Sequence, residues 1–574
     1  MILYANDIKI PFSETLSLRV YNPLFNDIGS HSFPLSFNAL DPQVRKAFGF
    51  ASIEEVSCSD LIPGRIVMDI IDMRGSWQIT DASNNRIEAF FKAGSGDFYS
   101  SVGDLLLTSV DFGGIKYPVG VYPTAEVLFS HMDDKMNAWF PQDEYATFCA
   151  YTPNAEGENT IADKQVVNEI QTDFGTAPEL KRKPNGNDTV YLFTGAVIEY
   201  IFKMFGYKIV TNVFREQYDL QRHVIFNAFN RRGHSGFDYS RLLPKVKVVD
   251  FLEAVRNQLN IMFVIKENIK EVSIIWFDTA ITSDPIKLRN KGISQSFDRR
   301  RTTGFLFGVN HPDDFSNNDF SGLSDFNDDV IIVDMARDIV PSILTKDEIY
   351  FVTNESAYYH IIEVDGDYEA ERLTPDLVPY TVGSGATPID QVAGLPAMGT
   401  WSRIYAEVPD PDPEPPNIPE SLETEVLYIM PRYDGEVGNS TKPYVPFPLM
   451  FCVARGIQPA YVVPNANPAV TVEHYPLGSY DVINALAEKI STANLALKWS
   501  GPYGLIAKMW ANRILWEMSI KIATSAEMTN EDLPSLIDHS TVKRIGSNNY
   551  LVNTLELECD PAETRIKGSE LFRL

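Results

Sequence analysis

The sequence predicts a β-rich α+β fold of several domains, with β-barrel-like domains and an α/β insert. Its 574 residues allow about three to five domains at roughly 100–200 residues each. Aromatic residues make up 12% of the chain, and Tyr and Phe far outnumber Trp, a balance that favours strands. Many short segments also alternate apolar with polar residues, as strands with one buried face do.

The first hundred residues predict a small antiparallel sheet or barrel. Apolar and polar residues alternate in three short runs before residue 40, and Asn22-Pro23 breaks the chain between two of them. This alternation indicates strands with one buried face and one exposed face. The predicted strands are Ile8 to Ile10, Leu16 to Val20, Phe33 to Phe37, Arg65 to Ile71, Trp77 to Thr80 and Arg86 to Lys92.

The middle of the chain predicts an α/β module, because helical and strand patterns follow each other twice. Apolar residues recur at helical spacing from Ala196 to Phe205, and Gly206 is placed as the C-cap. A second helix is predicted to begin at Asp250, an N-cap carboxylate with Glu253 as its capping-box partner. The strands predicted to follow are Tyr207 to Val210, Ile261 to Ile265 and Val272 to Phe277.

The last hundred residues predict a helix followed by a β-hairpin. Ile483, Leu486 and Ile490 mark the buried face of a helix that runs from Asp481 to about Leu497. The turn residues Gly546 to Asn548 indicate a hairpin. Its strands are predicted at Thr541 to Ile545 and Asn549 to Glu558, after a strand that alternates at Met518, Ile520 and Ile522.

Shifts in composition divide the chain into six predicted ranges. Pro409 to Pro419 is acidic and proline-rich, which predicts an extended, semi-rigid spacer. The ranges are a β-barrel-like domain at 1–125, a connecting β/loop region at 126–190, the α/β module at 191–285, a second β domain at 286–375, a Pro-rich insertion and docking region at 376–470, and a C-terminal helix with a closing β-hairpin at 471–574.

The net charge of −28 argues against a protein that grips nucleic acid, because phosphate binding needs clustered Lys and Arg. The charge is compatible with a conduit, since an acidic wall repels a duplex and leaves it free to slide. Solubility alone also explains it. Four scattered cysteines without a CxxC pair indicate reduced thiols rather than a zinc or redox motif.

No membrane anchor is predicted. The N-terminus lacks the basic and apolar runs of a signal peptide. The weakly charged region from Pro443 to Val472 is long enough to span a bilayer, but its six prolines are incompatible with a membrane helix. We therefore expect the protein to act in the cytoplasm or to leave the cell in a particle.

Catalytic motifs are missing from the sequence. It has no P-loop and no HExxH pair, and its glycines do not fit GxGxxG. Gly233 to Gly236 misses the GxSxG elbow by one position, so Ser235 is interpreted as a loop serine. A pair of carboxylates for glycoside cleavage is possible in so acidic a chain, but nothing singles one out. We predict no catalytic residue and no cofactor.

No metal site is predicted either. His131 and His311 each lie near two aspartates, a grouping that is common on solvated loops. The run from Asp314 to Asp325 loosely resembles a calcium loop, although Asp319 stands where an EF-hand needs glycine. A structural calcium ion therefore remains an open alternative.

A proline-aromatic run from Pro443 to Phe451 cannot form a helix and is too apolar for a free loop. It predicts a protein contact site. The alternative is an irregular segment buried within its own domain. Candidate partner contacts are Tyr444, Phe447, Met450, Phe451 and, outside the run, Trp401.

Three stretches resemble hub proteins from the tails and baseplates of tailed bacteriophages and prophages. Phe12 to Phe37, with Val20-Tyr21-Asn22-Pro23-Leu24-Phe25, is similar to their first strands. Lys245 to Leu252 resembles the helix that opens their α/β insert, and Lys543 to Leu571 resembles their closing hairpin. The range 376–470 departs from this pattern and is interpreted as an insertion.

The resemblance implies a virion structural protein at the tail tip, assembled in the host cytoplasm, with hub-like β-barrel domains. It implies a homotrimer whose paired barrels form a pseudo-sixfold ring. It also implies partners above and below the ring: the tail tube protein, the tape-measure protein, and central spike or tail-fibre proteins. Genomic DNA passes through such a hub without specific binding.

Two other functions stay open. A receptor- or glycan-binding tail protein is one, since exposed aromatic residues such as Trp401 or Tyr444 can stack on sugars. A tail-tip hydrolase of cell wall or surface glycan is the other, motivated by the surplus of carboxylates and aromatics.

Overall fold

The computed structural model describes most of the chain. The residues described are 1–22, 30–51, 61–68, 71–93, 95–114, 132–152, 166–172, 180–182, 188–227, 238–266, 269–297, 304–307, 331–333, 348–352, 357–364, 367–372, 380–383, 387–389, 393–406, 423–433, 446–462, 473–486, 488–519, 522–538, 541–560 and 564–574.

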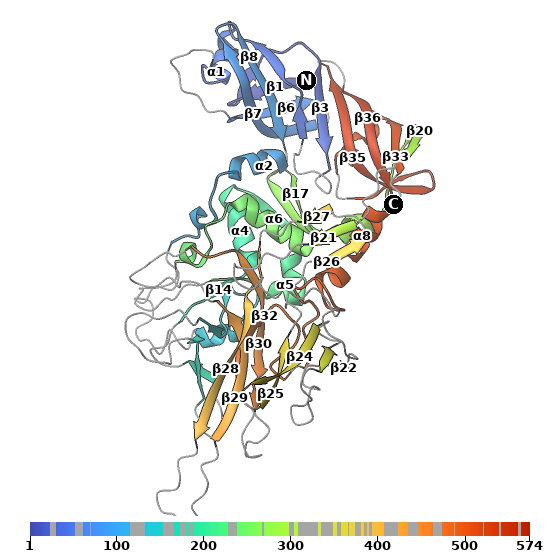
Figure 1. Cartoon of the computed structure of the whole chain (residues 1–574). Helices are drawn as coiled ribbons and strands as arrows, with labels where there is room; N and C mark the ends of the chain where they lie inside the picture. The colour runs from blue at the N-terminus through green and yellow to red at the C-terminus, as the bar shows by residue number, and fades with distance from the viewer. Residues whose placement is uncertain are drawn as a thin grey trace, which may run out of the picture.

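The described fold is β-rich α+β, as the sequence predicts, with several sheets and a smaller set of helices (Figure 1). The helices are α1 (Pro42–Ala47), α2 (Ser95–Val102), α4 (Thr194–Met204), α5 (Tyr218–Gln221), α6 (Val248–Leu259), α7 (Phe277–Thr282), the π-helix η11 (Ile506–Trp510), α8 (Ala511–Met518) and α9 (Leu533–Ile537).

The largest described sheet has 14 strands and joins the two ends of the chain (Figure 1). Its main path runs β2-β1-β6-β7-β8-β4-β3-β35-β36-β33-β20, with β5, β19 and β34 beside it. The strands are β1 (Ile2–Ala5), β2 (Ile8–Ile10), β3 (Leu16–Tyr21), β4 (Ser30–Ser32), β5 (Leu35–Asn38), β6 (Leu61–Met68), β7 (Ile71–Ser83), β8 (Arg86–Ala93), β19 (Ile286–Lys287), β20 (Asn290–Phe297), β33 (Ile522–Met528), β34 (Lys543–Ile545), β35 (Asn548–Cys559) and β36 (Thr564–Arg573).

Strand β3 and strand β35 are antiparallel neighbours in this sheet, with Leu16 opposite Cys559 and Tyr21 opposite Thr554. Where they pair, both strands alternate buried with half-buried residues, so their apolar faces enter one core. The N-terminal strands and the closing hairpin that the sequence predicts separately therefore belong to a single sheet.

Trp77 occupies the centre of the core under this sheet. It is fully buried and packs against Phe37 and Phe91, at ring-centroid distances of 5.4 and 5.1 Å. Its indole N–H donates to the Tyr4 carbonyl at 2.8 Å, which satisfies the one polar atom of the side chain. A Cβ on Gly64 would lie 2.4 Å from the indole, so this strand position requires glycine.

The predicted α/β module is confirmed in its main elements. A three-stranded sheet orders β15 (Lys208–Asn212), β18 (Glu271–Trp276) and β17 (Ile261–Lys266). Helix α4 ends before Gly206, whose φ of 76° lies in the left-handed region that glycine enters without penalty.

The predicted start of the second helix is wrong. Helix α6 begins at Val248 after Lys247, and Asp250 lies within the first turn instead of capping it. The amide of Val248 donates to the Leu105 carbonyl, and the amide of Leu107 donates to the Val246 carbonyl. This pairing fixes the chain before Asp250, so the helix starts earlier than the capping pattern suggests.

A further sheet connects the module to the later part of the chain. Its order is β16 (His223–Phe226), β30 (Met450–Pro459) and β32 (His474–Ser479). Phe148 stacks on Tyr191 with ring centroids 3.8 Å apart, and a Cβ on Gly478 would lie 2.3 Å from the Phe148 ring. Glycine is therefore needed where β32 passes this aromatic pair.

The helix predicted from Asp481 to Leu497 is not formed, because the described residues of this segment, 481–486 and 488–497, are turns, bends and irregular structure. The Asn484 side chain accepts hydrogen bonds from the amides of Leu486 and Glu488 at 2.9 and 3.0 Å. The Asp481 carboxylate accepts from the Val482 amide at 2.7 Å. Side-chain oxygens thus take the amides that a helix needs for its own ladder.

Smaller sheets complete the described architecture, and some of their strands come from different predicted ranges. In Figure 1 the long pair β28–β29 extends away from the module. Two of the smaller sheets have two strands each: β9 (Tyr145–Ala146) with β14 (Tyr191–Leu192), and β12 (Ile170–Thr172) with β13 (Leu180–Arg182). A five-stranded sheet contains β10 (Ala150–Tyr151), β11 (Val166–Val167), β28 (Ala397–Ala406), β29 (Glu423–Arg432) and β31 (Tyr461–Val462). The other two sheets consist of β21 (Gly304–Phe307), β26 (Tyr380–Gly383) and β27 (Thr387–Ile389), and of β22 (Ile331–Val333), β23 (Ile349–Val352), β24 (Ala357–Val364) and β25 (Asp367–Arg372).

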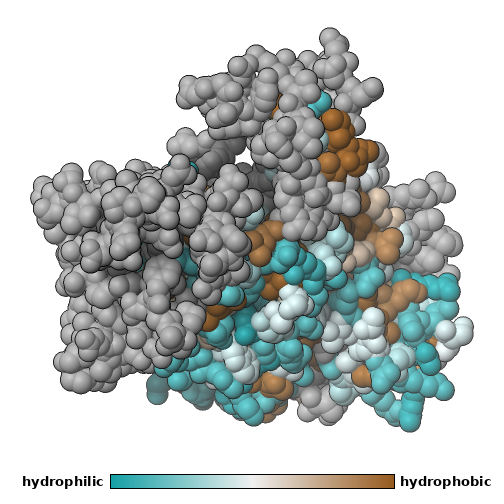
Figure 2. Space-filling view, turned by 90° about the horizontal axis from the view of Figure 1, so that it is seen from below, coloured by the Kyte–Doolittle hydropathy of each residue, from teal (hydrophilic) through white to brown (hydrophobic). Residues whose placement is uncertain are grey.

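The face in Figure 2 is mainly hydrophilic where residues are described, and its hydrophobic residues form separate groups. Scattered hydrophobic residues are ordinary on protein surfaces. Within the described part of the chain, no helix combines the length and the apolar character needed to cross a membrane.

Lys543 in β34 gives the large sheet a titratable buried group. Its ammonium donates to the Asp538 carbonyl at 2.7 Å and to the Thr541 hydroxyl. Burial lowers the pKa of this lysine from 10.5 to about 8. Between these values the unfolded chain binds more protons than the folded chain, so stability increases with pH across this window.

We expect Lys543→Met to remove this pH dependence. Below pH 8 the folded chain carries the full penalty of a buried charge, up to about 3 kcal/mol for a shift of this size. The difference in Tm between the variant and the parent should therefore narrow from pH 8 to pH 10.5. Thermal unfolding at a series of pH values measures this difference. If the Tm of the variant and the Tm of the parent changed in parallel with pH, Lys543 would not have the lowered pKa.

Candidate functional site

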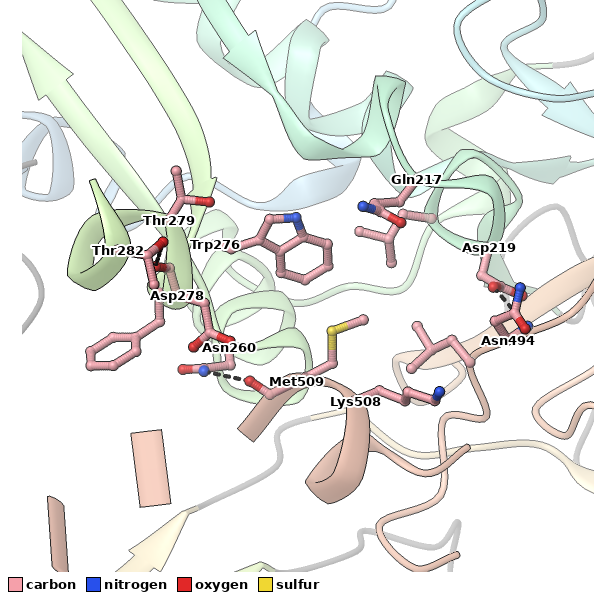
Figure 3. Close-up of a pocket in the computed structure, with 13 residues that line it drawn as sticks. Gln217, Asp219, Asn260, Trp276, Asp278, Thr279, Thr282, Asn494, Lys508 and Met509 are labelled. Atoms are coloured by element: carbon pink, nitrogen blue, oxygen red, sulfur yellow. Dashed lines mark hydrogen bonds between the residues drawn. The ribbon is translucent and has the colours of Figure 1, made fainter. Parts of the chain in front are cut away.

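A cavity of about 350 Å³ lies where the α/β module meets the segment that precedes α8 (Figure 3). Four separate parts of the chain line it: α5 with the residue before it, the end of α6, the junction of β18 with α7, and the segment that includes η11. Its lining residues are Gln217, Asp219, Leu220, Asn260, Trp276, Phe277, Asp278, Thr279, Thr282, Asn494, Leu495, Lys508 and Met509.

One edge of the cavity is held by a buried ion pair. Arg455 of β30 lies 2.6 Å from the Asp219 carboxylate, and their side chains are 2% and 9% exposed. Arg455 also donates to the Leu495 carbonyl at 2.7 Å, while Asp219 accepts from the Asn494 amide at 3.0 Å. Burial lowers the pKa of Arg455, and the nearby carboxylate opposes this shift. The pair thus ties β30, α5 and residues 494–495 together.

The opposite side contains two unusual backbone conformations. Asn260 ends α6 with φ of 51°, in the left-handed region. Its side chain donates to the Met509 carbonyl at 2.7 Å and accepts from Arg513 at 2.9 Å. Met509 belongs to the π-helix η11, a conformation often found at functional sites. Strained backbone of both kinds is over-represented at binding and catalytic sites.

Trp276 presents a partly exposed indole at this cavity (Figure 3). It stands at the end of β18, where the chain turns into α7, and packs partly against the large core. Gln217 and Thr279 are exposed lining residues in Figure 3, and Lys508 lies over the Tyr503 ring at 5.2 Å. The cavity therefore combines an aromatic wall with amide, hydroxyl and amine groups.

The two carboxylates of the cavity already have partners. Asp219 is in the ion pair with Arg455, and Asp278 accepts from Asn512 at 2.7 Å. Among the residues that the structure describes, no group of three or more His, Cys, Asp or Glu side chains could hold a metal ion. The arrangement is suited to binding a molecule through stacking and hydrogen bonds.

His223 lies in the core nearby. Its Nδ1 is 2.7 Å from the Thr194 hydroxyl, and its ring is 4.9 Å from that of Phe451. Burial lowers the pKa of His223 to about 3, so the ring is neutral at physiological pH. A neutral ring enclosed by aromatic side chains is a packing residue.

The predicted contact residues in the proline-aromatic run are mostly internal. Phe447, Met450 and Phe451 are 8%, 0% and 0% exposed and belong to the large core. Met450 and Phe451 begin β30 and pair with Phe226 and Ile225 of β16. These three side chains are therefore buried within the chain's own fold, which is the alternative that the sequence left open.

For the other candidate residues the structure describes at most the backbone. Trp401 lies on β28 opposite Tyr428 of β29, and its side chain is outside what the structure describes. The remaining predicted positions fall outside the described residues altogether: Ser235, His131, His311, Asp314 to Asp325, Pro409 to Pro419 and Tyr444.

Sequence reasoning missed the cavity around Trp276. The sequence predicts Trp276 and Phe277 as the end of a strand, which is correct for Trp276, and no motif marks either residue as part of a site. The one local signal is the Trp-Phe-Asp run at the boundary between β18 and α7, where a large aromatic residue precedes a short helix.

No family model matches this chain, and no curated protein matches it. Among solved structures, one similar chain is the 43 kDa tail protein of prophage MuSo2 from Shewanella oneidensis. It is 9% identical, with a TM-score of 0.30, and the match covers 100% of this chain and 97% of that chain. Similarity at this level does not establish a shared fold or a shared function.

Proposed function

We propose that this chain is a structural protein of a phage tail and forms the hub at the tail tip. The observation that carries the proposal is the pairing of β3 with β35. These strands lie in two of the stretches that resemble tail hub proteins, and they are adjacent in one sheet although they stand at opposite ends of the chain (Figure 1).

The third resembling stretch, Lys245 to Leu252, also has a defined place. It leads into α6, and Lys247 forms a β-bridge with Leu106, which follows α2. Helix α2 in turn follows β8 of the large sheet. The α/β insert is therefore attached directly behind the N-terminal strands, an arrangement that is compatible with the proposed hub.

Charge supports a hub that surrounds a channel. The net charge of −28 repels a DNA duplex, so an acidic wall would let the genome slide without binding. The proposed assembly is a homotrimer that contacts the tail tube and tape-measure proteins on one side and spike or fibre proteins on the other. Obligate interfaces of this kind are large and apolar at their centre.

Two measurements test the proposal. Light scattering after size exclusion should give a mass three times that of the 64.5 kDa chain. A cryo-EM map of the particle should place three copies around the tail axis. A monomer at micromolar concentration that also lies off the axis in the particle would contradict the hub.

Binding of a glycan is a second candidate function, favoured by the Trp276 cavity.

A further inference from the structure

We propose that the cavity beside Trp276 binds a single neutral hexose ring. The proposal concerns this cavity alone and does not depend on the tail function. The first support is the indole of Trp276, which is partly exposed and lines the cavity in Figure 3. One face of a pyranose carries only C–H groups, and such a face packs favourably on an aromatic ring.

Polar side chains around the indole match the hydroxyls of a sugar. Gln217 and Asn494 offer amides that both donate and accept, and Thr279 offers a hydroxyl with the same dual capacity. The side chains of Gln217 and Thr279 are exposed and have no hydrogen-bond partner within the described part of the chain. Because both side chains are exposed, their polar atoms are accessible to a ligand.

The charge of the cavity favours a neutral ligand. The Asp219 carboxylate is compensated by Arg455 at 2.6 Å. The two remaining charged lining residues, Asp278 and Lys508, have opposite signs. With the ion pair set aside, a phosphate or a carboxylate would meet one lysine and one carboxylate, which give it no net attraction, whereas an uncharged polyol needs none.

The size of the cavity limits the ligand to about one ring. Its volume of about 350 Å³ is near the lower end of small-molecule sites, which span roughly 300–1,000 Å³. The ion pair and the Asn260–Met509 hydrogen bond fix three of its walls in advance. Walls that are already ordered lose little entropy when a small ligand binds.

The test uses the full chain and a panel of methyl glycosides of glucose, galactose, mannose, N-acetylglucosamine and rhamnose. Saturation-transfer NMR detects binding, and a titration gives the Kd. We expect at least one glycoside to bind with a Kd on the order of 1 mM. Trp276→Ala should raise that Kd at least about tenfold, and Trp276→Phe should raise it less, because a smaller aromatic face remains.

A matched control and a second set of variants keep the test independent of folding. Phe33→Ala removes an aromatic side chain that is 46% exposed and lies between β4 and β5, far along the chain from the cavity residues, and it should leave the Kd unchanged. Gln217→Ala and Thr279→Val alter exposed lining residues, so they should fold normally and weaken binding roughly three- to tenfold each.

Three outcomes would overturn the proposal. One is the absence of glycoside binding up to about 50 mM, well above the expected Kd. Another is a Kd that stays the same in Trp276→Ala and Gln217→Ala. The third is a purified neighbouring protein that protects Trp276 from fluorescence quenching while no glycoside does. In that case the cavity receives a protein side chain instead of a sugar.

Discussion

Replacing Arg455 with methionine is expected to lower the free energy of unfolding by about 3–5 kcal/mol. The guanidinium neutralises Asp219, whose side chain is only 9% exposed. Without it, the carboxylate keeps one hydrogen bond from the Asn494 amide but has no countercharge in a nonpolar environment. A buried charge without its partner destabilises the fold by far more free energy than the intact pair contributes to stability.

Urea unfolding followed by tryptophan fluorescence measures the effect as a shift in the midpoint of the transition. The matched control is Arg289→Met, because Arg289 pairs with Glu531 on the surface, where the side chains are 79% and 70% exposed. That change should cost no more than about 1 kcal/mol.

Replacing both buried partners supplies a second check. The double variant Arg455→Met with Asp219→Leu should recover most of the loss, because no charge remains buried. A midpoint for Arg455→Met equal to that of Arg289→Met would show that water reaches the pair and screens it.

Leu557→Lys is expected to destabilise the large sheet severely, by about 4 kcal/mol or more, and to yield largely insoluble protein. Leu557 in β35 is 1% exposed and stands opposite Leu18 of β3, which is equally buried. An ammonium at this position points into a core of apolar side chains, among them Leu18, Leu555 and Ile566.

The matched control is Glu558→Lys, the same new side chain one residue further along the strand. Successive strand residues point to opposite faces of a sheet, and Glu558 is on the less buried face. Its effect should stay within about 1 kcal/mol. The soluble fraction after expression and the Tm of both variants test this, and equal behaviour would mean that the register of β35 is shifted.

Local sequence patterns correctly predict the elements that depend mainly on residues within one short segment of the chain. The apolar spacing of α4 and the glycine after it are both in the sequence, and Gly206 has the expected left-handed conformation. The hairpin of β34 and β35 closes at Gly546, with Ile545 opposite Asn548. In each case one residue type satisfies a backbone requirement that few others meet.

Other features depend on contacts that a local pattern does not contain. The segment after Asp481 has helical spacing, yet the Asn484 side chain binds the amides of two following residues. The Trp276 cavity is built from four segments between residues 217 and 509, and each is ordinary in isolation. Its position follows from long-range packing and from the Arg455–Asp219 pair, which no spacing rule anticipates.

The pairing of β3 with β35 has a consequence for synthesis. More than 500 residues separate the two strands, so the ribosome needs roughly half a minute to two minutes to supply the second after the first. For that time the nascent N-terminal sheet carries an open edge that can pair with other chains. Yield in expression should therefore improve at low temperature or with chaperones that bind exposed strands, and it should suffer most when translation stalls before the last hundred residues.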